Sequence, residues 1–457
     1  MTTGALVSFS PTASVRESCR LWMDHSKPCD DRLLEESDYP QNPKCSVSIN
    51  SDALDRFSLE ITNSILANKS LQVSEWDADG WHYTGKNYRA GVQSTSDRNV
   101  LMKMERVALY VLTMDAINFC FWPTSRKDSK NILEYEHLAI ALRKVAEQDD
   151  GADKCDSTGS ENICDDSSVV QSSPTYALSP TNLSKLTPQQ LKDLLLPHLP
   201  QSHDEASEII STHYEIPDIN VRCHLLNELG HGLLEKHNAS ALHMISKANK
   251  SADALVGIIL DTFPGFRDYI DGDVSSSHKW ETSKKSSATV HFYKRAQIAV
   301  ADLWASLGRC HKQSFALETS EKSSKLLTCC EFEDMDTITT FPDYRVPQIL
   351  RHVNVLEYRD DLAHKVDSQI ELDKGCMDEI SIRAATVVAV EDLVSKVKQH
   401  LFSISSQSID EKARGNMQAI ANDVSAVTID WYLWQQGEKL DRMNLMQPHH
   451  RVHTTFY

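Results

Sequence analysis

Residues 99–114 read NVLMKMERVALYVLTM, and their apolar side chains recur every three or four residues. This is the period of one face of an α-helix. The same spacing returns in residues 225–234, 292–304 and 380–401, whereas the apolar and polar alternation of half-buried strands is almost missing from the sequence. These four amphipathic segments predict an all-α fold.

Two short helices are expected where the second half of this fold begins. Ser179 precedes Pro180, and Thr187 precedes Pro188, with Gln190 three residues after the threonine. A hydroxyl residue followed by proline is typical of a helix N-cap and first turn. Helices are therefore expected to begin at both prolines.

The length of 457 residues matches about three domains by the usual size of a domain, although one helical domain with insertions fits as well. A hydrophobic content of 40% with 25% charged residues is enough for a core without metal or disulfide staples. Segments 26–50 and 149–173 are poor in large apolar side chains, so we expect both to be mobile insertions. A shorter loop is expected at 271–289.

Charge and cysteine usage exclude several classes of protein. A net charge of −18 repels phosphate backbones, so direct binding to nucleic acid is not expected. No window holds the roughly 18 uninterrupted apolar residues of a membrane helix, and no signal peptide is recognisable. The 11 cysteines form no CxxC pair. A cytoplasmic protein is expected, with the nucleus as a possible second location.

Three carboxylates, Asp334, Asp336 and Asp343, lie ahead of a helix that Pro347 can start. The helix dipole favours charge there and lowers the carboxyl pKa, which suits a nucleophile or a group that stabilises a cation. Ordinary helix caps fit the same pattern. The helix over 346–352, a turn at Asn354 and the apolar run that follows have the outline of a helix-hairpin-helix, although a plain helical hairpin explains them equally well.

Two further patterns have both a binding and a structural explanation. Lys294 and Arg295 stand in the first turn of an apolar helix, where a cation opposes the dipole, so either a bound anion or an ordinary salt bridge compensates them. Aromatic and polar residues alternate at 115–122 and at 430–434, as they do around a stacked base or in a plain core. The histidines show no metal-ligand spacing, and no cofactor is expected.

Several segments together resemble the queuosine salvage proteins, which act as queuosine 5′-phosphate N-glycosidases. The matching pieces occur in the family's order from about residue 100 to the last residue, whereas the first hundred residues match only loosely. They are Asp115-Ala-Ile-Asn-Phe-Cys-Phe-Trp122, Thr262-Phe-Pro-Gly-Phe-Arg-Asp268, Phe292-Tyr-Lys-Arg-Ala-Gln-Ile-Ala-Val-Ala-Asp302, Ile338-Thr-Thr-Phe-Pro-Asp-Tyr-Arg-Val-Pro-Gln348, Asp430-Trp-Tyr-Leu-Trp434 and Pro448-His-His-Arg-Val-His-Thr-Thr-Phe-Tyr457.

The resemblance implies a single all-α domain over 1–457, similar to helix-hairpin-helix DNA glycosylases. It also implies cleavage of the N-glycosidic bond of queuosine 5′-monophosphate, which releases queuine for reinsertion into tRNA. Breaking this bond leaves positive charge on the sugar, so a fixed carboxylate is needed beneath C1′. Asp334 is expected to supply it, with Asp343 also catalytic and Asp336 close by.

The other site residues follow from the same motifs. The base is expected to contact Asn118, Phe119, Phe121 and Trp122, and Tyr344 is expected near the catalytic centre. Lys294 and Arg345 are the expected contacts of the 5′-phosphate, with Asp302 orienting one of them from behind. A monomer that acts on this small nucleotide is expected.

Two other functions remain open at this point. A non-catalytic helical scaffold that binds nucleotides or a protein through its acidic surface would bind the substrate and leave it unchanged. A DNA glycosylase would fit the fold, but the net charge of −18 argues against it.

Overall fold

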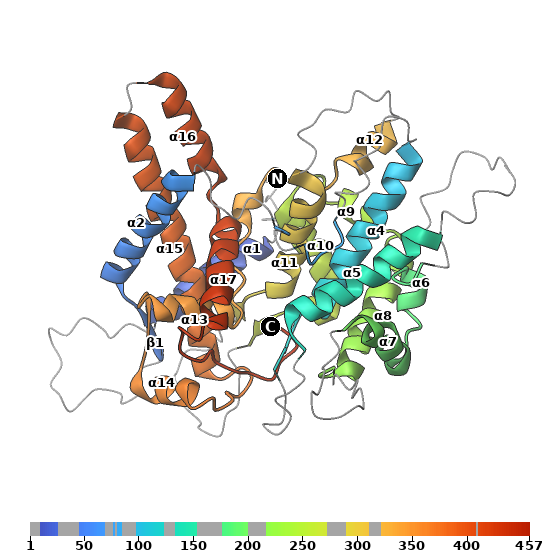
Figure 1. Ribbon diagram of the computed structural model, residues 1–457, viewed down its shortest axis with the longest axis horizontal. Helices are drawn as coiled ribbons and strands as arrows, with labels where there is room; N and C mark the ends of the chain where they lie inside the picture. Colours follow the sequence, from blue (N-terminus) through green and yellow to red (C-terminus); the bar gives the residue numbers. More distant parts are fainter. Residues whose placement is uncertain are drawn as a thin grey trace, which may run out of the picture.

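The computed structural model describes residues 10–25, 45–68, 76–77, 80–84, 97–122, 133–152, 176–199, 216–271, 289–309, 321–407 and 410–457. These residues are mostly helical, as Figure 1 shows, and their only strands of two or more residues form two small antiparallel pairs. The expected all-α character is therefore confirmed.

The described elements of the first half follow one another in this order. They are α1 (Pro11–His25), β1 (Val47–Ile49), α2 (Ser51–Asn68), α4 (Asp97–Ala116), α5 (Tyr135–Ala152), α6 (Pro180–Leu183), α7 (Pro188–Leu195), a 3-10 turn at Leu196–His198, α8 (Ile219–Lys236), α9 (Ala241–Ser246) and α10 (Ala252–Thr262).

The second half begins with a 3-10 turn at Pro264–Phe266. It continues with β2 (Tyr269–Ile270), β3 (Val290–His291), α11 (Lys294–Leu303), a π-helical turn at Trp304–Gly308, α12 (Glu321–Leu327), a 3-10 turn at Met335–Thr337, α13 (Arg345–His352), β4 (Leu356–Tyr358), α14 (Asp360–Asp367), α15 (Met377–Gln407), α16 (Glu411–Asp423) and α17 (Ala426–Arg442).

Two apolar clusters make up the core, and each belongs to one lobe. The α4 lobe gathers α1, α4, α5 and α7 to α11 around one cluster. The α15 lobe gathers α2, α13, α14, α16, α17 and the β1–β4 pair around the other, with Val47 opposite Tyr358 in that pair. In Figure 1 the helices α2, α15 and α16 form the left side, and α4 to α8 form the right side.

Helix α15 joins the two lobes because it is apolar on more than one face. Ile380 and Ala384 belong to the cluster of the α4 lobe, whereas Ile382 and Ala385 belong to the cluster of the α15 lobe. A helix that is hydrophobic around its circumference is stable only when protein covers it on all sides. Packing of α1 and α2 against α15 supplies part of this cover.

The predicted helices are present, and the predicted caps explain where two of them begin. Segments 99–114, 225–234, 292–304 and 380–401 correspond to α4, α8, α11 and α15, although α11 begins only at Lys294 and the residues after Leu303 continue as the π-helical turn. The hydroxyl of Ser179 accepts a hydrogen bond from the backbone N–H of Asn182 at the start of α6. At α7, Thr187 and Gln190 form a reciprocal capping box.

The expected helical hairpin was wrong in its second half. Asn354 does adopt a positive φ of 60°, as expected, and the chain turns there after α13. The apolar run that follows is the strand β4, because Leu356 and Tyr358 pair with β1 instead of coiling into a helix. The next helix, α14, begins only at Asp360.

The predicted insertions lie mainly outside the described residues. Of 26–50, only 45–50 are described, and they include β1; of 149–173, only 149–152 are described, at the end of α5. The loop 271–289 is described only at its two ends. Among the described helices, none is long and apolar enough to cross a membrane.

Candidate active site

A cavity lies where the two lobes meet, and it has a volume of about 910 Å³ with the solvent at its mouth included. Protein pockets that bind small molecules usually have volumes of about 300–1,000 Å³. The α4 lobe contributes Asn118, Phe121, Tyr135, Lys294, Ile298 and Asp302, and the α17 helix contributes Asp430, Trp431, Trp434 and Gln435. The remaining walls are Phe341, Asp343, Tyr344, Tyr457 and the segment residues Trp76, Asp77, Trp81 and His82.

Lys294 places a buried cation in this cavity. It is the first residue of α11, and its backbone N–H donates to the carboxylate of Asp268 at 3.2 Å. Its side chain is 3% exposed, and within the described part of the chain its Nζ has neither a hydrogen bond nor an ion pair. Burial lowers the pKa of Lys294, while the Asp343 carboxylate opposes that shift. An anion that enters the cavity therefore meets a positive group that no protein group neutralises at contact distance.

Asp268 and Arg383 hold the start of α11 in place. The Arg383 guanidinium donates to both carboxylate oxygens of Asp268, at 2.9 and 2.5 Å, and both side chains are almost fully buried. Paired geometry of this kind is the strong form of a buried ion pair. Because Asp268 also accepts from the N–H of Lys294, this pair fixes where the lysine emerges from the helix.

Asp343 stands at the beginning of α13, with one oxygen committed to the helix and the other directed elsewhere. Its Oδ1 accepts from the backbone N–H groups of Arg345 and Val346, at 2.8 and 2.9 Å. Its Oδ2 has no hydrogen-bond partner among the described residues, and the side chain lines the cavity. Burial raises the pKa of Asp343, while Lys294 and the two N–H groups oppose that rise. The lowered pKa expected from the helix dipole was wrong for this residue, because desolvation outweighs the dipole.

Asp430 is a second buried carboxyl group at the same end of the cavity. Its Oδ2 accepts from the hydroxyl of Thr340 and from the backbone N–H of Phe341, while its Oδ1 has no partner among the described residues. Burial, together with the charge of Asp343, raises the pKa of Asp430 to about 8. At neutral pH Asp430 therefore keeps its proton, which makes it a hydrogen-bond donor beside an acceptor.

Asp302 forms another acidic position on the same helix as Lys294. Its Oδ1 accepts from the indole N–H of Trp76 at 2.9 Å. Asp115 lies nearby and is fully buried. Burial raises the pKa of both carboxyl groups, and the charge of Asp115 raises the pKa of Asp302 further. Asp302 lines the cavity itself, whereas the sequence placed it behind another residue.

Aromatic rings surround the remaining part of the cavity. Trp76 stacks on His82 with ring centroids 4.3 Å apart, and Trp434 meets Tyr135 edge-on at 5.6 Å. The two nitrogens of His82 lie 3.2 and 3.4 Å from the hydroxyl oxygens of Tyr110 and Tyr135. Burial lowers the pKa of His82 to about 3, so its ring is neutral. Such a wall can stack a planar heterocycle.

Tyr457 closes the cavity from the end of the chain. Its ring lies 4.6 Å from the guanidinium carbon of Arg383, and its hydroxyl donates to Glu379 at 3.1 Å. Both partners belong to α15, while its main-chain oxygen accepts from the N–H of Cys120. The final segment therefore ties the two lobes together beside the cavity.

Asp334 does not lie in this cavity. Its carboxylate accepts from the hydroxyl of Ser251 at 2.6 Å and from the N–H of Ala252 at 2.5 Å, at the start of α10. It is thus a capping group of that helix, which is the alternative that the sequence left open. Asp336 is exposed, and its carbonyl oxygen accepts from Arg16. Neither position supports the role expected for these two residues near the sugar.

Arg345 is also absent from the cavity walls, because acidic residues of α17 already hold its guanidinium. It donates to Glu438 at 2.7 Å and lies 3.0 Å from an oxygen of Asp441. Helix α17 passes so close that a Cβ at Gly437 would come within 2.8 Å of the arginine side chain. The expected phosphate contact through Arg345 is therefore not supported.

Two of the expected base contacts lie behind the walls. Phe119 is buried between Arg222 and Arg295, whose guanidinium carbons are 4.4 and 5.5 Å from its ring centroid. Trp122 meets Tyr344 edge-on at 5.5 Å without being a wall residue itself. Asn118, Phe121, Lys294 and Tyr344 do line the cavity.

The sequence reasoning overlooked four residues of segment 76–82, namely Trp76, Asp77, Trp81 and His82. The aromatic and acidic pattern of WDADGWHY, residues 76–83, was the signal that could have found them. Asp430, Trp431, Trp434 and Tyr457 belong to motifs quoted above but were not assigned to the site.

Comparison with known proteins identifies the family of this chain. The sequence profile described as "Queuosine salvage protein" matches residues 99–457. The chain belongs to this family. The matched region includes Lys294, Asp343 and Asp430, whereas the four wall residues from segment 76–82 precede it.

Curated relatives extend over most of the chain. A Dictyostelium discoideum protein named queuosine 5′-phosphate N-glycosylase/hydrolase is 29% identical over 415 residues, which is 90% of this chain and 94% of the relative. Proteins of the same name from Sphaerobacter thermophilus and Mus musculus are 28% and 25% identical, covering 77% and 76% of this chain and 82% and 81% of their own.

Proposed function

We propose that this protein hydrolyses the N-glycosidic bond of queuosine 5′-monophosphate and so releases queuine for salvage into tRNA. Water adds to C1′ of the ribose, and its second proton ends on the base, so that the products are queuine and ribose 5-phosphate. The observation that carries the proposal is the cavity itself, where Asp343, Asp430 and Lys294 each present a polar atom without a partner among the described residues. The names of the relatives support the choice of substrate.

Asp343 is proposed as the carboxylate beneath C1′, in place of Asp334. The bond breaks through a sugar cation, and a fixed negative oxygen stabilises that cation more than it stabilises the neutral ground state. The two N–H groups at the start of α13 hold the carboxylate in one orientation, which leaves Oδ2 for the sugar. The neighbouring Lys294 favours its ionised form.

Asp430 is proposed to donate a hydrogen bond to the departing base. A 7-deazapurine has carbon in place of the N7 that many purine hydrolases protonate, so another donor has to stabilise the negative charge that develops on the base. A carboxyl group with a pKa of about 8 is protonated at neutral pH and can fill that role.

Lys294 is proposed to bind the 5′-phosphate. It is the residue of the expected phosphate pair that reaches the cavity, whereas Arg345 is held by Glu438 and Asp441. An ammonium group that has no ion pair binds a dianionic phosphate more strongly than a neutral side chain would. The phosphate in turn supplies a counter-ion for Lys294, whose Nζ has no ion pair among the described residues.

The base is proposed to lie between the aromatic walls, with Asn118 and Phe121 beside it. The cavity also holds Asp77 and Asp302 on its aromatic side, which adds two carboxyl groups to Asp343 and the protonated Asp430. Queuine carries a secondary amine on its side chain, which is a cation at neutral pH. An acidic wall that receives this amine would explain why the cavity is more acidic than a phosphate site alone requires.

We also propose that residues 1–457 form one domain related to helix-hairpin-helix glycosylases, supported by the mostly helical fold and by helix α15, which contributes to both apolar clusters. The protein is proposed to act as a monomer in the cytoplasm, or in the nucleus. The net charge of −18 supports a small nucleotide as the substrate in preference to a nucleic acid.

The test is incubation of the purified protein with queuosine 5′-monophosphate, followed by chromatography of the products. We expect stoichiometric queuine and ribose 5-phosphate from the wild type, and guanosine 5′-monophosphate left intact in a parallel reaction. Recovery of bound but unchanged queuosine 5′-monophosphate would instead establish the non-catalytic scaffold.

A further inference from the structure

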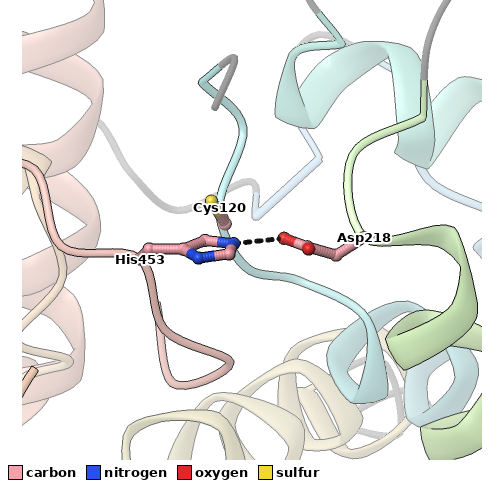
Figure 2. A group of neighbouring side chains, drawn as sticks. All are labelled: Cys120, Asp218 and His453. Carbon is pink, nitrogen blue, oxygen red and sulfur yellow. Dashed lines mark hydrogen bonds and ion pairs between the residues drawn. The ribbon is translucent and has the colours of Figure 1, made fainter. Parts of the chain in front are cut away.

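A second cluster of reactive side chains lies outside the cavity walls. Cys120, Asp218 and His453 each offer one possible metal-ligand atom, and these three atoms all lie within 4.8 Å of one another. The residues come from the loop after α4, the N-cap position of α8 and the C-terminal segment. Figure 2 shows the imidazole of His453 directed at the carboxylate of Asp218, with Cys120 beside the ring.

The backbone holds this cluster in shape without any ligand. Cys120 and Asp218 have φ angles of 46° and 51°, in the left-handed region that residues other than glycine seldom adopt. Arg222 fixes both positions, because it donates to the carbonyl oxygens of Cys120 and Pro217 at 3.0 and 2.8 Å. Strained backbone held by several independent bonds is common at binding sites.

The C-terminal segment completes the arrangement. The N–H of Cys120 donates to the main-chain oxygen of Tyr457 at 3.1 Å, and Nε2 of His453 lies 2.8 Å from Oδ2 of Asp218. Asp218 is 22% exposed and His453 is 47% exposed at the side chain. Water and ions can therefore reach the imidazole, while the thiol stays buried beneath it.

We propose that Cys120, Asp218 and His453 form a zinc site. Thiolate, imidazole and carboxylate are the three ligand types that Zn²⁺ prefers, and a softer or harder ion would favour a more uniform set. With the thiolate and the carboxylate charged and the imidazole neutral, the three ligands balance the charge of the ion. Water takes the fourth position on the exposed side of His453.

The site would act on structure and not on bond cleavage. Phe121, which follows the ligand Cys120, and Tyr457, which lies four residues after the ligand His453, are both walls of the cavity. A metal that joins His453 to Cys120 and Asp218 therefore fastens the C-terminal segment to the α4 lobe. This inference does not depend on the identity of the nucleotide substrate.

The direct test is titration of the full chain with Co²⁺ under reducing conditions, because cobalt replaces zinc and reports a bound thiolate by its near-ultraviolet charge-transfer band. We expect one Co²⁺ per chain with this band, displaced by Zn²⁺. Saturating Zn²⁺ should raise the melting temperature by at least about 2 °C. A wild type that shows no such band, or no zinc-dependent shift, would overturn the proposal.

Variants then assign the ligands. Cys120→Ser should abolish the band, and His453→Gln, at an exposed position that can change without disturbing the core, should weaken Zn²⁺ binding at least about tenfold. Cys45→Ser is the matched control, because Cys45 is a free thiol elsewhere in the chain. His137→Gln is a second control, in the separate group of Glu134, Glu136 and His137, where the histidine is half-buried. Binding that survives His453→Gln unchanged, or that is lost in a control, contradicts the assignment.

Discussion

Two helix starts in this protein each carry an aspartate, and they use it differently. At α10, both oxygens of Asp334 are taken by Ser251 and Ala252. At α13, one oxygen of Asp343 takes both N–H groups, which leaves the other oxygen to the cavity. A carboxylate stabilises only the fold when both of its oxygens accept hydrogen bonds at a helix start. When only one oxygen does so, the other oxygen can also act on a ligand.

The largest expected effect is loss of turnover in Asp343→Asn. Asparagine keeps an oxygen for the two N–H groups but removes the negative charge that stabilises the sugar cation, so kcat should fall about 10³-fold or more. Asp334→Asn, the matched change at α10, should keep kcat within about 3-fold. The measurement is the rate of queuine release at saturating substrate. Equal losses of kcat in the two variants would contradict the different roles assigned to Asp334 and Asp343.

The next largest effect is expected from Asp430→Asn. Loss of the proton donor should lower kcat about 10²-fold near neutral pH. In the wild type, activity should fall as the pH rises through about 8, because Asp430 then loses its proton, and this alkaline decline should disappear in the variant. A pH profile of kcat for both proteins is the measurement. An alkaline decline that persists in Asp430→Asn must belong to another group.

Lys294→Gln tests the cation whose charge acts on Asp343 in the cavity. Because the ammonium is proposed to hold the 5′-phosphate, kcat/KM for queuosine 5′-monophosphate should fall about 30-fold or more. The same ratio for unphosphorylated queuosine should change less than about 3-fold. If both substrates lose equally, the lysine serves the cleavage step or the position of Asp343 instead of the phosphate.

A smaller effect, on stability alone, is expected from Asp334→Ala. Removal of the group that caps α10 should lower the free energy of unfolding by about 1–2 kcal/mol. Asp336→Ala is the control, because Asp336 is exposed and Arg16 donates to its backbone carbonyl oxygen, which the substitution keeps. Its effect should stay within about 0.5 kcal/mol. Urea unfolding of both variants measures the difference.

The last expected effect is a change in how stability depends on pH. The folded pKa of Asp430 is raised to about 8 from the ordinary 3.8, so the unfolded chain releases this proton at lower pH than the folded chain does. Its contribution to stability is therefore complete below about pH 4 and is lost as the pH rises toward 8. Asp430→Asn should accordingly be more stable than the wild type at pH 9. If the variant is less stable than the wild type at pH 9, ionisation of Asp430 costs the folded protein little free energy.

Local patterns were sufficient for the helices but not for the hairpin after α13. The apolar period of 99–114 predicts α4, and Thr187 with Gln190 predicts the start of α7, because both depend on neighbours within one or two turns. Residues 356–358 look like part of another helix, yet they pair with β1 about 310 positions earlier. No local signal specifies that partner.

The sequence by itself determined the helical class, the family and the types of residue available for the chemistry, because motifs such as Phe341-Pro-Asp343 and Asp430-Trp431 lie in short contiguous segments. Only the tertiary structure decided which aspartate faces the cavity. Asp334 and Asp343 both precede short helices, and what separates them is contact with residues far along the chain: Ser251 completes the hydrogen bonds of one, whereas Lys294 and Asp430 surround the other. The contacts of Asp334 form within the α4 lobe, whereas those of Asp343 form only where the two lobes pack together.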